Sequence, residues 1–166
     1  MVIIKTSLGD ITLTLDEANA PISVANFLAY AKDGHYVGTI FHRVIDGFMI
    51  QCGGMTADMK PKKTKPAIKN ESSNGLKNVK YSIAMARTNV PDSATSQFFI
   101  NTKDNGLLNK EQSADRVGYA VFGMVTDGID IVDKIGKVAT GNRNGHGDVP
   151  VETIEILEVT ITDAAS

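Results

Sequence analysis

The sequence predicts a mainly β protein whose antiparallel sheet is closed or sandwiched. Short segments with strand-like apolar patterns recur along the chain, and turns marked by glycine separate them. Only two segments, far apart in sequence, have helical spacing of apolar residues. Many short strands joined by turns are typical of antiparallel sandwiches and barrels. Two such helices could cover the open ends of a barrel.

The chain is expected to begin with a β-hairpin and then a helix. Residues 11–15 alternate apolar side chains with threonine, the period-two pattern of a half-buried strand, and residues 2–4 form its partner. A helix then starts at Pro21, since proline is favoured in the first turn, and Gly34 is a suitable end. Its apolar residues at helical spacing are Val24, Phe27, Leu28 and Ala31.

The middle of the chain contains strands and one long loop. Two strands joined by a turn at Asp46-Gly47 are followed by a segment, residues 55–78, that is rich in Lys, Pro, Asn and Ser and lacks periodicity. We expect this segment to be a surface loop. The expected strands of this region and beyond are residues 39–44, 47–51, 81–86, 97–101 and 119–125.

The last quarter of the chain predicts a helix, a loop and a closing strand. Residues 127–138 repeat the amphipathic helical pattern, and residues 141–147 read as a glycine-rich loop. Residues 153–161 form the final strand. Its apolar phase slips between Ile156 and Leu157, which predicts a β-bulge there.

Size and composition indicate an ordinary globular domain over residues 1–166. The chain has 166 residues and a mass of 17.8 kDa, within the ~100–200 residues of a common domain. A net charge of −2 gives no reason to expect a nucleic-acid partner. We therefore read the lysines of residues 60–65 as a solvated loop. No apolar run suits a signal peptide or a membrane span, so we expect a cytoplasmic protein that binds no membrane.

The titratable residues predict no metal site. Cys52 is the single cysteine, so no internal disulfide forms, and nothing near it in sequence would lower the pKa of its thiol. Three scattered histidines have no ligand spacing. His42 is expected to be structural. The glycines of residues 141–147 lack the strand-to-helix context of a dinucleotide loop.

Two segments carry most of the chemical information. The first is Phe41-His42-Arg43-Val44-Ile45-Asp46-Gly47-Phe48-Met49-Ile50-Gln51, and the second joins residues 85–88 to Ser96-Gln97-Phe98-Phe99-Ile100-Asn101. In a strand, Gln97 and Phe99 project to one face while Phe98 and Ile100 project to the other. Met49 and Gln51 repeat the mixture of apolar and amide side chains. Such a surface would suit an apolar ligand attached to a peptide backbone.

These segments resemble the cyclophilin family of peptidyl-prolyl isomerases. The run Phe-His-Arg-x-Ile-x-Gly-Phe-Met-x-Gln and the run Ser-Gln-Phe-Phe-Ile occur in the family's order and spacing, and flanking similarity covers nearly the whole chain. Residues 70–76 and 85–88 are similar to the bacterial cytoplasmic branch. The resemblance implies an eight-stranded antiparallel closed β-barrel capped by two α-helices. It also implies prolyl isomerase activity that assists protein folding and needs no cofactor.

The resemblance also implies the roles of particular residues. Arg43 is similar to the family's catalytic arginine, and Gln51 and Gln97 match positions that hold the substrate backbone. The wall of the proline pocket corresponds to Phe48, Met49, Phe99 and Leu108. The edge that meets the residue before proline corresponds to Ala86, Arg87 and Thr88.

Two positions depart from the best-known eukaryotic members. Leu107 stands where they have tryptophan, and Tyr119 stands where they have histidine. Both changes leave the arginine and the pocket intact, so turnover is still expected. Loss of the indole implies weak binding of the drug cyclosporin.

Alternative functions follow from the same residues. A module that binds proline-containing peptides without turnover would need the pocket but not Arg43. A structural subunit of a larger assembly would need a large exposed apolar face. The presence of Arg43 favours an isomerase that acts, as a monomer, on proline-containing peptides and on unfolded or flexible protein clients.

Overall fold

The computed structural model describes residues 1–113 and 116–162, so the last four positions of the predicted domain lie outside the described residues. Ten strands, two α-helices and two 3₁₀ helices occur within the described ranges. The strands are β1 (Val2–Thr6), β2 (Gly9–Leu15), β3 (Thr39–Ile45), β4 (Met49–Thr56), β5 (Ser82–Met85), β6 (Phe98–Asn101), β7 (Val121–Asp127), β8 (Thr140–Arg143), β9 (His146–Pro150) and β10 (Ile156–Ile161). The helices are α1 (Pro21–Lys32), α2 (Ile129–Gly136), η1 (Ser72–Asn74) and η2 (Gly106–Leu108).

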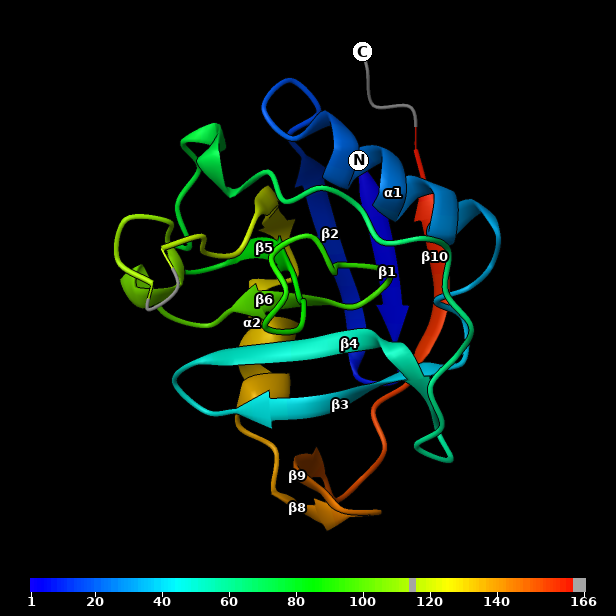
Figure 1. Ribbon diagram of the computed structural model, residues 1–166. Coiled ribbons are helices and arrows are strands. Elements are labelled where there is room, and N and C mark those ends of the chain that lie inside the picture. Colours follow the sequence, from blue (N-terminus) through cyan, green and yellow to red (C-terminus); the bar gives the residue numbers. More distant parts are fainter. Residues whose placement is uncertain (114–115, 163–166) are drawn as a thin grey trace.

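Eight strands form one antiparallel sheet that curls into a nearly closed barrel (Figure 1). Their order is β10-β1-β2-β7-β5-β6-β4-β3. The two edges meet where the backbone N–H of Phe41 donates to the carbonyl of Ile154 at 3.0 Å, and that of Gly38 donates to Ile156 at 2.9 Å. The eight-stranded barrel expected from the family resemblance is confirmed.

The bulge predicted near the end of the chain is also present. In the pairing of β1 with β10, Lys5 lies opposite Glu158 while Thr6 lies opposite Ile156, so Leu157 is the extra residue. Ile156 is fully buried and Leu157 is exposed. One inserted residue reverses the faces of the strand from that point on, which explains the slip in apolar phase.

The prediction of a glycine-rich loop at residues 141–147 was wrong. This segment forms most of a separate hairpin, β8–β9, in which Arg143 pairs with His146. Asn144 and Gly145 make the turn with positive φ angles of 49° and 80°. An Asn-Gly pair is well suited to a two-residue hairpin turn because both positions need positive φ. The hairpin packs Val149 against Ile40 of β3.

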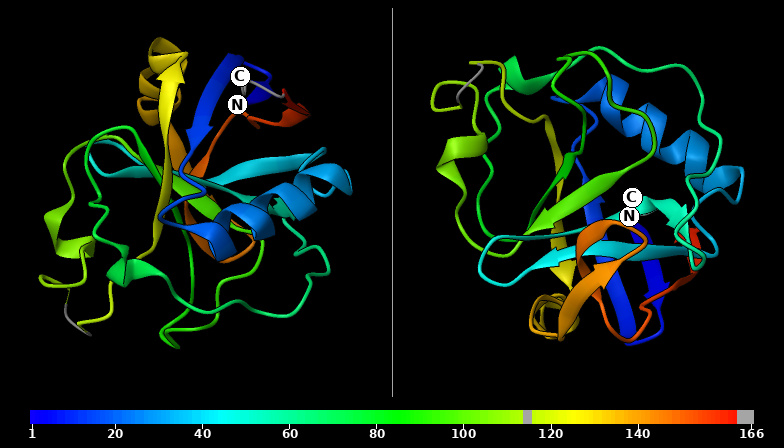
Figure 2. Two further views of the ribbon diagram at one scale, coloured as in Figure 1. Left: turned by 90° about the horizontal axis from the view of Figure 1, so that it is seen from above. Right: turned by 60° about the horizontal axis from the view of Figure 1, so that its bottom comes forward.

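The two α-helices lie on different sides of the barrel (Figure 2) and pack into the same core. Helix α1 inserts Phe27, whose ring centroid lies 5.2 Å from that of Tyr36, 5.3 Å from Phe98 and 5.6 Å from Phe122. Helix α2 inserts Val132 and Ile135. Neither helix is long and apolar enough to cross a membrane, within the part of the chain that is described.

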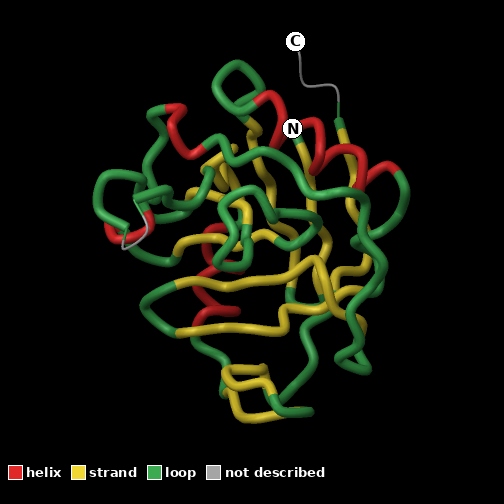
Figure 3. The backbone as a smooth tube through the Cα atoms, viewed as in Figure 1, coloured by secondary structure: helices red, strands yellow, loops and turns green. Residues whose placement is uncertain are grey.

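Irregular backbone gathers around β4, β5 and β6 (Figure 3). The long loop expected at residues 55–78 is shorter than predicted, because β4 continues to Thr56 and η1 interrupts its end. The Glu71 carboxylate accepts hydrogen bonds from the backbone N–H groups of Ser23 at 2.6 Å and Ile22 at 3.2 Å. A carboxylate on free N–H groups at a helix N-terminus is stabilising. It attaches this loop to α1.

We expect Phe27→Ala to lower the free energy of unfolding by about 3–5 kcal/mol, because it removes the central ring of the aromatic cluster from a site with 0% exposure. Ile22→Ala, on the same helix at 41% exposure, is the control and should change stability by roughly 0.5 kcal/mol or less. Urea unfolding followed by circular dichroism measures both. Equal losses would show that α1 does not close the core.

Candidate active site

The strand register places a row of side chains on the outer face of the barrel. Across four neighbouring strands, Arg43 lies opposite Gln51, Gln51 opposite Phe99, and Phe99 opposite Ala84. Side chains of directly opposed residues share a face of the sheet. The row therefore brings a cation, an amide and an aromatic ring together.

Alternation along β6 separates this face from the core, as the sequence predicts. Phe98 and Ile100 belong to the main hydrophobic core, whereas Phe99 belongs to a second apolar cluster outside it. That second cluster is completed from loops as well as strands. Its buried and partly buried members are Met49, Ala84, Ala86, Phe99, Val121, Ile45, Phe48, Leu76, Leu108 and Tyr119.

A cavity of about 190 Å³ lies over this second cluster. It brings together nine of the twelve residues that the sequence analysis singled out. They are Arg43, Phe48, Met49, Gln51, Ala86, Arg87, Phe99, Leu108 and Tyr119. Its floor is apolar, and charged and amide groups converge on its rim, the usual composition of a small-ligand site.

Thr88 and Gln97 line an adjoining cavity of about 140 Å³, which shares Gln51, Ala86 and Arg87 with the first. Gln51 Nε2 donates to Gln97 Oε1 at 2.8 Å between the two cavities. Two further residues of this second cavity, Ser93 and Thr95, were missed by sequence reasoning. They lie in an irregular segment without periodicity, so no sequence signal marked them.

Leu107 is the predicted site residue that the structure leaves outside both cavities. Its side chain is 78% exposed, whereas its neighbour Leu108 lines the first cavity. Both belong to the 3₁₀ turn η2. Consecutive residues of so short a turn point in different directions, so only one of them contacts the pocket.

The two arginines at the first cavity differ in their bonding. Arg43 is exposed, and its guanidinium has no hydrogen bond or ion pair to any described residue. Arg87 donates from Nε and Nη2 to the carbonyl of Gly118, at 3.1 and 2.8 Å, and from Nη1 to Thr88. The donors of Arg43 are therefore unoccupied among the described residues, while Arg87 is part of the wall.

Arg87 also stacks on an aromatic residue. Its guanidinium carbon lies 4.4 Å from the centroid of the Tyr119 ring, and Tyr119 meets Phe99 edge-to-face at 5.7 Å. Arginine stacked on an aromatic ring is favourable by about 0.5–2 kcal/mol. The stack orders one wall of the cavity, and no sequence pattern indicated it.

A larger cavity, of about 670 Å³, lies between β2, β7 and residues 76–79. It contains none of the predicted site residues, and its cation, Lys77, is paired with Glu111 at 3.0 Å. Its walls are apolar, with Asp16 and Glu17 at the edge. It lacks the free guanidinium and the amides of the smaller cavity, so the smaller cavity is the candidate active site.

The remaining titratable groups are consistent with structural roles. Burial raises the pKa of the Cys52 thiol well above its usual value, and Cys52 is completely enclosed. Within the described ranges, no group of three or more His, Cys, Asp or Glu side chains could hold a metal ion.

Comparison with known families matches residues 1–161 to the cyclophilin type peptidyl-prolyl cis-trans isomerase/CLD family. The chain belongs to this family. It is therefore a peptidyl-prolyl cis-trans isomerase, an assignment that curated relatives support. A peptidyl-prolyl cis-trans isomerase of Streptomyces antibioticus is 57% identical over 159 residues, covering 95% of this chain and 96% of the relative.

Further members of the cyclophilin family also match nearly the whole chain. Peptidyl-prolyl cis-trans isomerase B of Escherichia coli (strain K12) is 52% identical and covers 98% of this chain and 100% of the relative. A cyclophilin from Cryptosporidium parvum, solved in the presence of the dipeptide Ala-Pro, superposes with a TM-score of 0.80 at 27% identity. It covers 97% of this chain and 98% of that one.

The histidine next to Arg43 gives this cyclophilin a testable pH dependence. Burial, with smaller contributions from the electrostatic interactions with His146 and Arg43, lowers the pKa of His42 from 6.5 to about 4. Between these values the unfolded chain binds a proton that the folded chain does not. The free energy of unfolding is therefore highest above pH 6.5 and decreases as the pH falls towards 4.

We expect an NMR titration of the His42 ring to have its midpoint near pH 4. The free energy of unfolding should fall by about 2–3 kcal/mol more between pH 7 and pH 4 in the native protein than in His42→Gln. A midpoint near 6.5, or equal pH dependence in the two proteins, would contradict this.

Proposed function

We propose that this isomerase rotates X–Pro bonds in flexible protein chains by means of the Arg43 guanidinium above an apolar proline pocket. The observation that supports this most is the contrast between the two arginines. Arg43 keeps all its donors free among the described residues, at the rim of a pocket whose other arginine is already bonded. No cofactor and no metal take part in the proposed reaction.

The reaction requires rotation about a partial double bond. Resonance gives the peptide C–N bond a rotational barrier of ~18–20 kcal/mol, so uncatalysed X–Pro exchange takes ~10–100 s. No covalent bond breaks. A catalyst therefore has to localise electrons on the prolyl nitrogen and to hold one side of the bond while the other turns.

Arg43 suits the first of these tasks. As the nitrogen becomes pyramidal, its lone pair becomes able to accept a hydrogen bond that the planar amide cannot accept. An interaction that forms only near the transition state raises turnover rather than affinity alone. Arginine stays charged at any relevant pH and offers a rigid set of donors.

The pocket suits the second task. Met49 and Phe99 on strands, with Phe48, Leu108 and Tyr119 on loops, would enclose the pyrrolidine ring and exclude water. Gln51 would hold the substrate backbone, and the adjoining cavity with Ala86, Arg87, Thr88 and Gln97 would receive the residues before proline.

Positioning of the substrate is needed in addition to the hydrogen bond from Arg43. A turnover of order 10³ s⁻¹ requires the barrier to fall by roughly 6 kcal/mol. One charge-assisted hydrogen bond contributes ~1.5–3 kcal/mol. The rest has to come from the fixed orientation of the ring and of the preceding backbone.

We further propose proline-containing peptides and unfolded or flexible clients as substrates, with assistance to protein folding as the result. The Cryptosporidium relative solved in the presence of Ala-Pro supports this class. We also propose that the domain acts as a monomer in the cytoplasm, without nucleic-acid or membrane partners. The net charge of −2 and the single, buried cysteine favour these assignments.

Exchange NMR on an X–Pro peptide tests the role of Arg43. We expect Arg43→Ala to lower kcat/KM on the order of 10–100-fold, the equivalent of one lost charge-assisted bond in the transition state. Arg143→Ala is the matched control: Arg143 is an exposed arginine on β8 that donates to Ala57. This variant should retain native activity.

Two results would oppose the proposal. Equal exchange rates for Arg43→Ala and the native protein would remove Arg43 from the mechanism. Peptide binding without accelerated exchange in the native protein would leave only a proline-binding module.

Cyclosporin binding is expected to be weak, since an exposed leucine stands at position 107. We expect Leu107→Trp to increase cyclosporin affinity on the order of tenfold, through the larger apolar surface and the indole N–H. Leu157→Trp, at another exposed leucine on β10, is the control. Isothermal titration calorimetry measures both, and equal affinities in the two variants would contradict a role for position 107.

A further inference from the structure

The active-site pocket is held in two different ways. Arg43, Met49, Gln51 and Phe99 lie on strands, so the hydrogen bonds of the ladder position their backbones. Three large apolar residues of the wall do not lie on strands. Phe48 lies in the turn between β3 and β4, Leu108 in η2, and Tyr119 in the segment before β7.

Three buried asparagines connect these irregular segments. They are Asn78, Asn101 and Asn105, which are 1%, 0% and 5% exposed. None of them lines the pocket. Buried amides require partners, because an unsatisfied one costs about 1–3 kcal/mol. Their partners therefore indicate what the group does.

The amides form a chain with one direction. Asn105 Nδ2 donates to Asn101 Oδ1 at 2.7 Å, and Asn101 Nδ2 donates to Asn78 Oδ1 at 3.1 Å. Asn101 Nδ2 also donates to Ser82 Oγ at 2.9 Å. In each link an amide N–H₂ faces an amide oxygen, so the orientation of every member is determined by its neighbour.

Both ends of the chain reach the loop half of the pocket. Asn105 Nδ2 donates to the backbone carbonyl of Phe48 at 2.8 Å. At the other end, Asn78 Nδ2 donates to the carbonyls of Leu108 at 3.2 Å and Tyr119 at 3.3 Å. The backbone carbonyls of Phe48, Leu108 and Tyr119 are thus the targets of one network.

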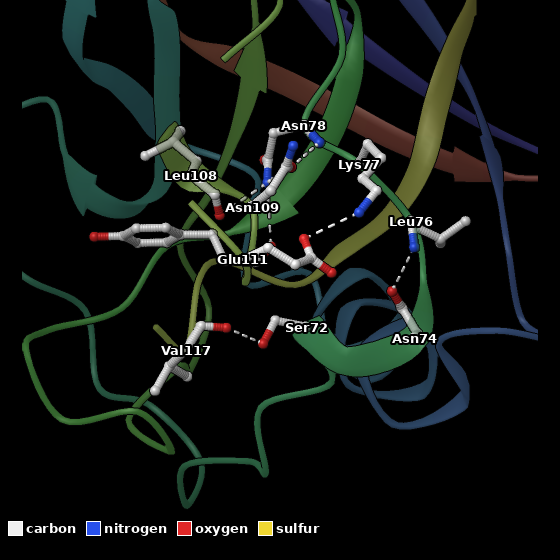
Figure 4. Close-up of polar contacts among 10 residues, drawn as sticks. Ser72, Asn74, Leu76, Lys77, Asn78, Leu108, Asn109, Glu111 and Val117 are labelled. Atoms are coloured by element: carbon white, nitrogen blue, oxygen red, sulfur yellow. Dashed lines mark hydrogen bonds and ion pairs between the residues drawn. The ribbon is translucent and has the colours of Figure 1, made fainter. Parts of the chain in front are cut away.

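A neighbouring residue reinforces the Asn78 end. Asn109 Oδ1 accepts from the backbone N–H of Asn78 at 2.6 Å and from its Nδ2 at 3.2 Å, as Figure 4 shows beside Leu108. The ion pair of Lys77 with Glu111 joins the same two segments at the surface. An exposed pair contributes little, so the buried amides are the main connection.

We propose that Asn78, Asn101 and Asn105 are positioning residues that set the spacing of Phe48, Leu108 and Tyr119 around the proline ring. This inference rests on the proposed function, because it takes the cavity at Arg43 to be the proline pocket. The asparagines do not touch substrate. They act through the backbone of the wall, so replacing them should weaken binding of the proline ring and leave Arg43 in place.

Asn78→Asp tests the proposal with almost no change of shape. It replaces the donor Nδ2 by an oxygen that faces the carbonyls of Leu108 and Tyr119, so it separates the wall from the network. Ring binding contributes to both ground and transition states. We therefore expect KM for an X–Pro peptide to rise on the order of tenfold while kcat stays within about twofold.

Asn105→Ser is the second variant, and it removes the bond to Phe48 at the other end. It should also raise KM, and the double variant should raise KM by less than the product of the two effects, because both act on one network. Thr39→Val is the control: Thr39 is buried and donates to the carbonyl of Tyr36 at 2.6 Å, outside the site. It should lower stability and leave KM unchanged.

The assay is run well below the melting temperature of each variant, and peptide affinity is measured separately by NMR titration. Native KM and native peptide affinity in a folded Asn78→Asp or Asn105→Ser would overturn the proposal. So would unfolding of both variants, since a network that only sets the pocket leaves the barrel core intact. The affinity readout needs no turnover, so it stays informative if Arg43→Ala shows the catalytic proposal to be wrong.

Discussion

The packing of Phe27 against Phe98 and Phe122 inside the closed sheet is the constraint on which the site depends. Because Phe98 packs in the core, the alternation of side chains along β6 places Phe99 outside the barrel. The ladder then brings Phe99 next to Gln51, and Gln51 next to Arg43. The position of Arg43, Gln51 and Phe99 on one outer face is therefore a consequence of closing the core, because a slip of one residue would reverse both faces together.

The pocket combines a rigid half with a half that is built from loops. Strands hold the guanidinium of Arg43 and the amide of Gln51, so that in the proposed mechanism both groups would meet the substrate in a fixed direction. Loops and short turns supply Phe48, Leu108 and Tyr119 to the apolar wall. Buried amide hydrogen bonds give these loops the order that a ladder gives to strands.

Two arginines at one pocket illustrate how the environment divides roles between like residues. Arg87 is stacked on Tyr119 and bonded to Gly118, so its charge is used to order the wall. Arg43 extends from β3 without such partners among the described residues. Electrostatic stabilisation of a transition state depends on donors that are oriented in advance but not already occupied.

Local sequence patterns were sufficient to predict several elements of the fold. Alternation identified the hairpin at the start of the chain, the two faces of β6 and the bulge at Leu157, and helical spacing identified α1 and α2. The motif around Arg43 indicated most of the pocket, through its resemblance to a family. Each of these signals spans only a few neighbouring residues, and over that range the pattern of side chains controls the backbone.

The loops that complete the candidate site became evident from long-range contacts alone. The bond of Asn105 to Phe48 joins residues 57 apart in sequence, and that of Asn78 to Tyr119 joins residues 41 apart. The sequence likewise did not indicate that Ser93 and Thr95 line the second cavity, or that Arg87 stacks on Tyr119. An asparagine or a serine in an irregular segment belongs to no periodic pattern of apolar and polar side chains, so the sequence does not indicate its hydrogen-bond partner. Its role depends on which distant carbonyl the closed barrel brings within hydrogen-bonding distance.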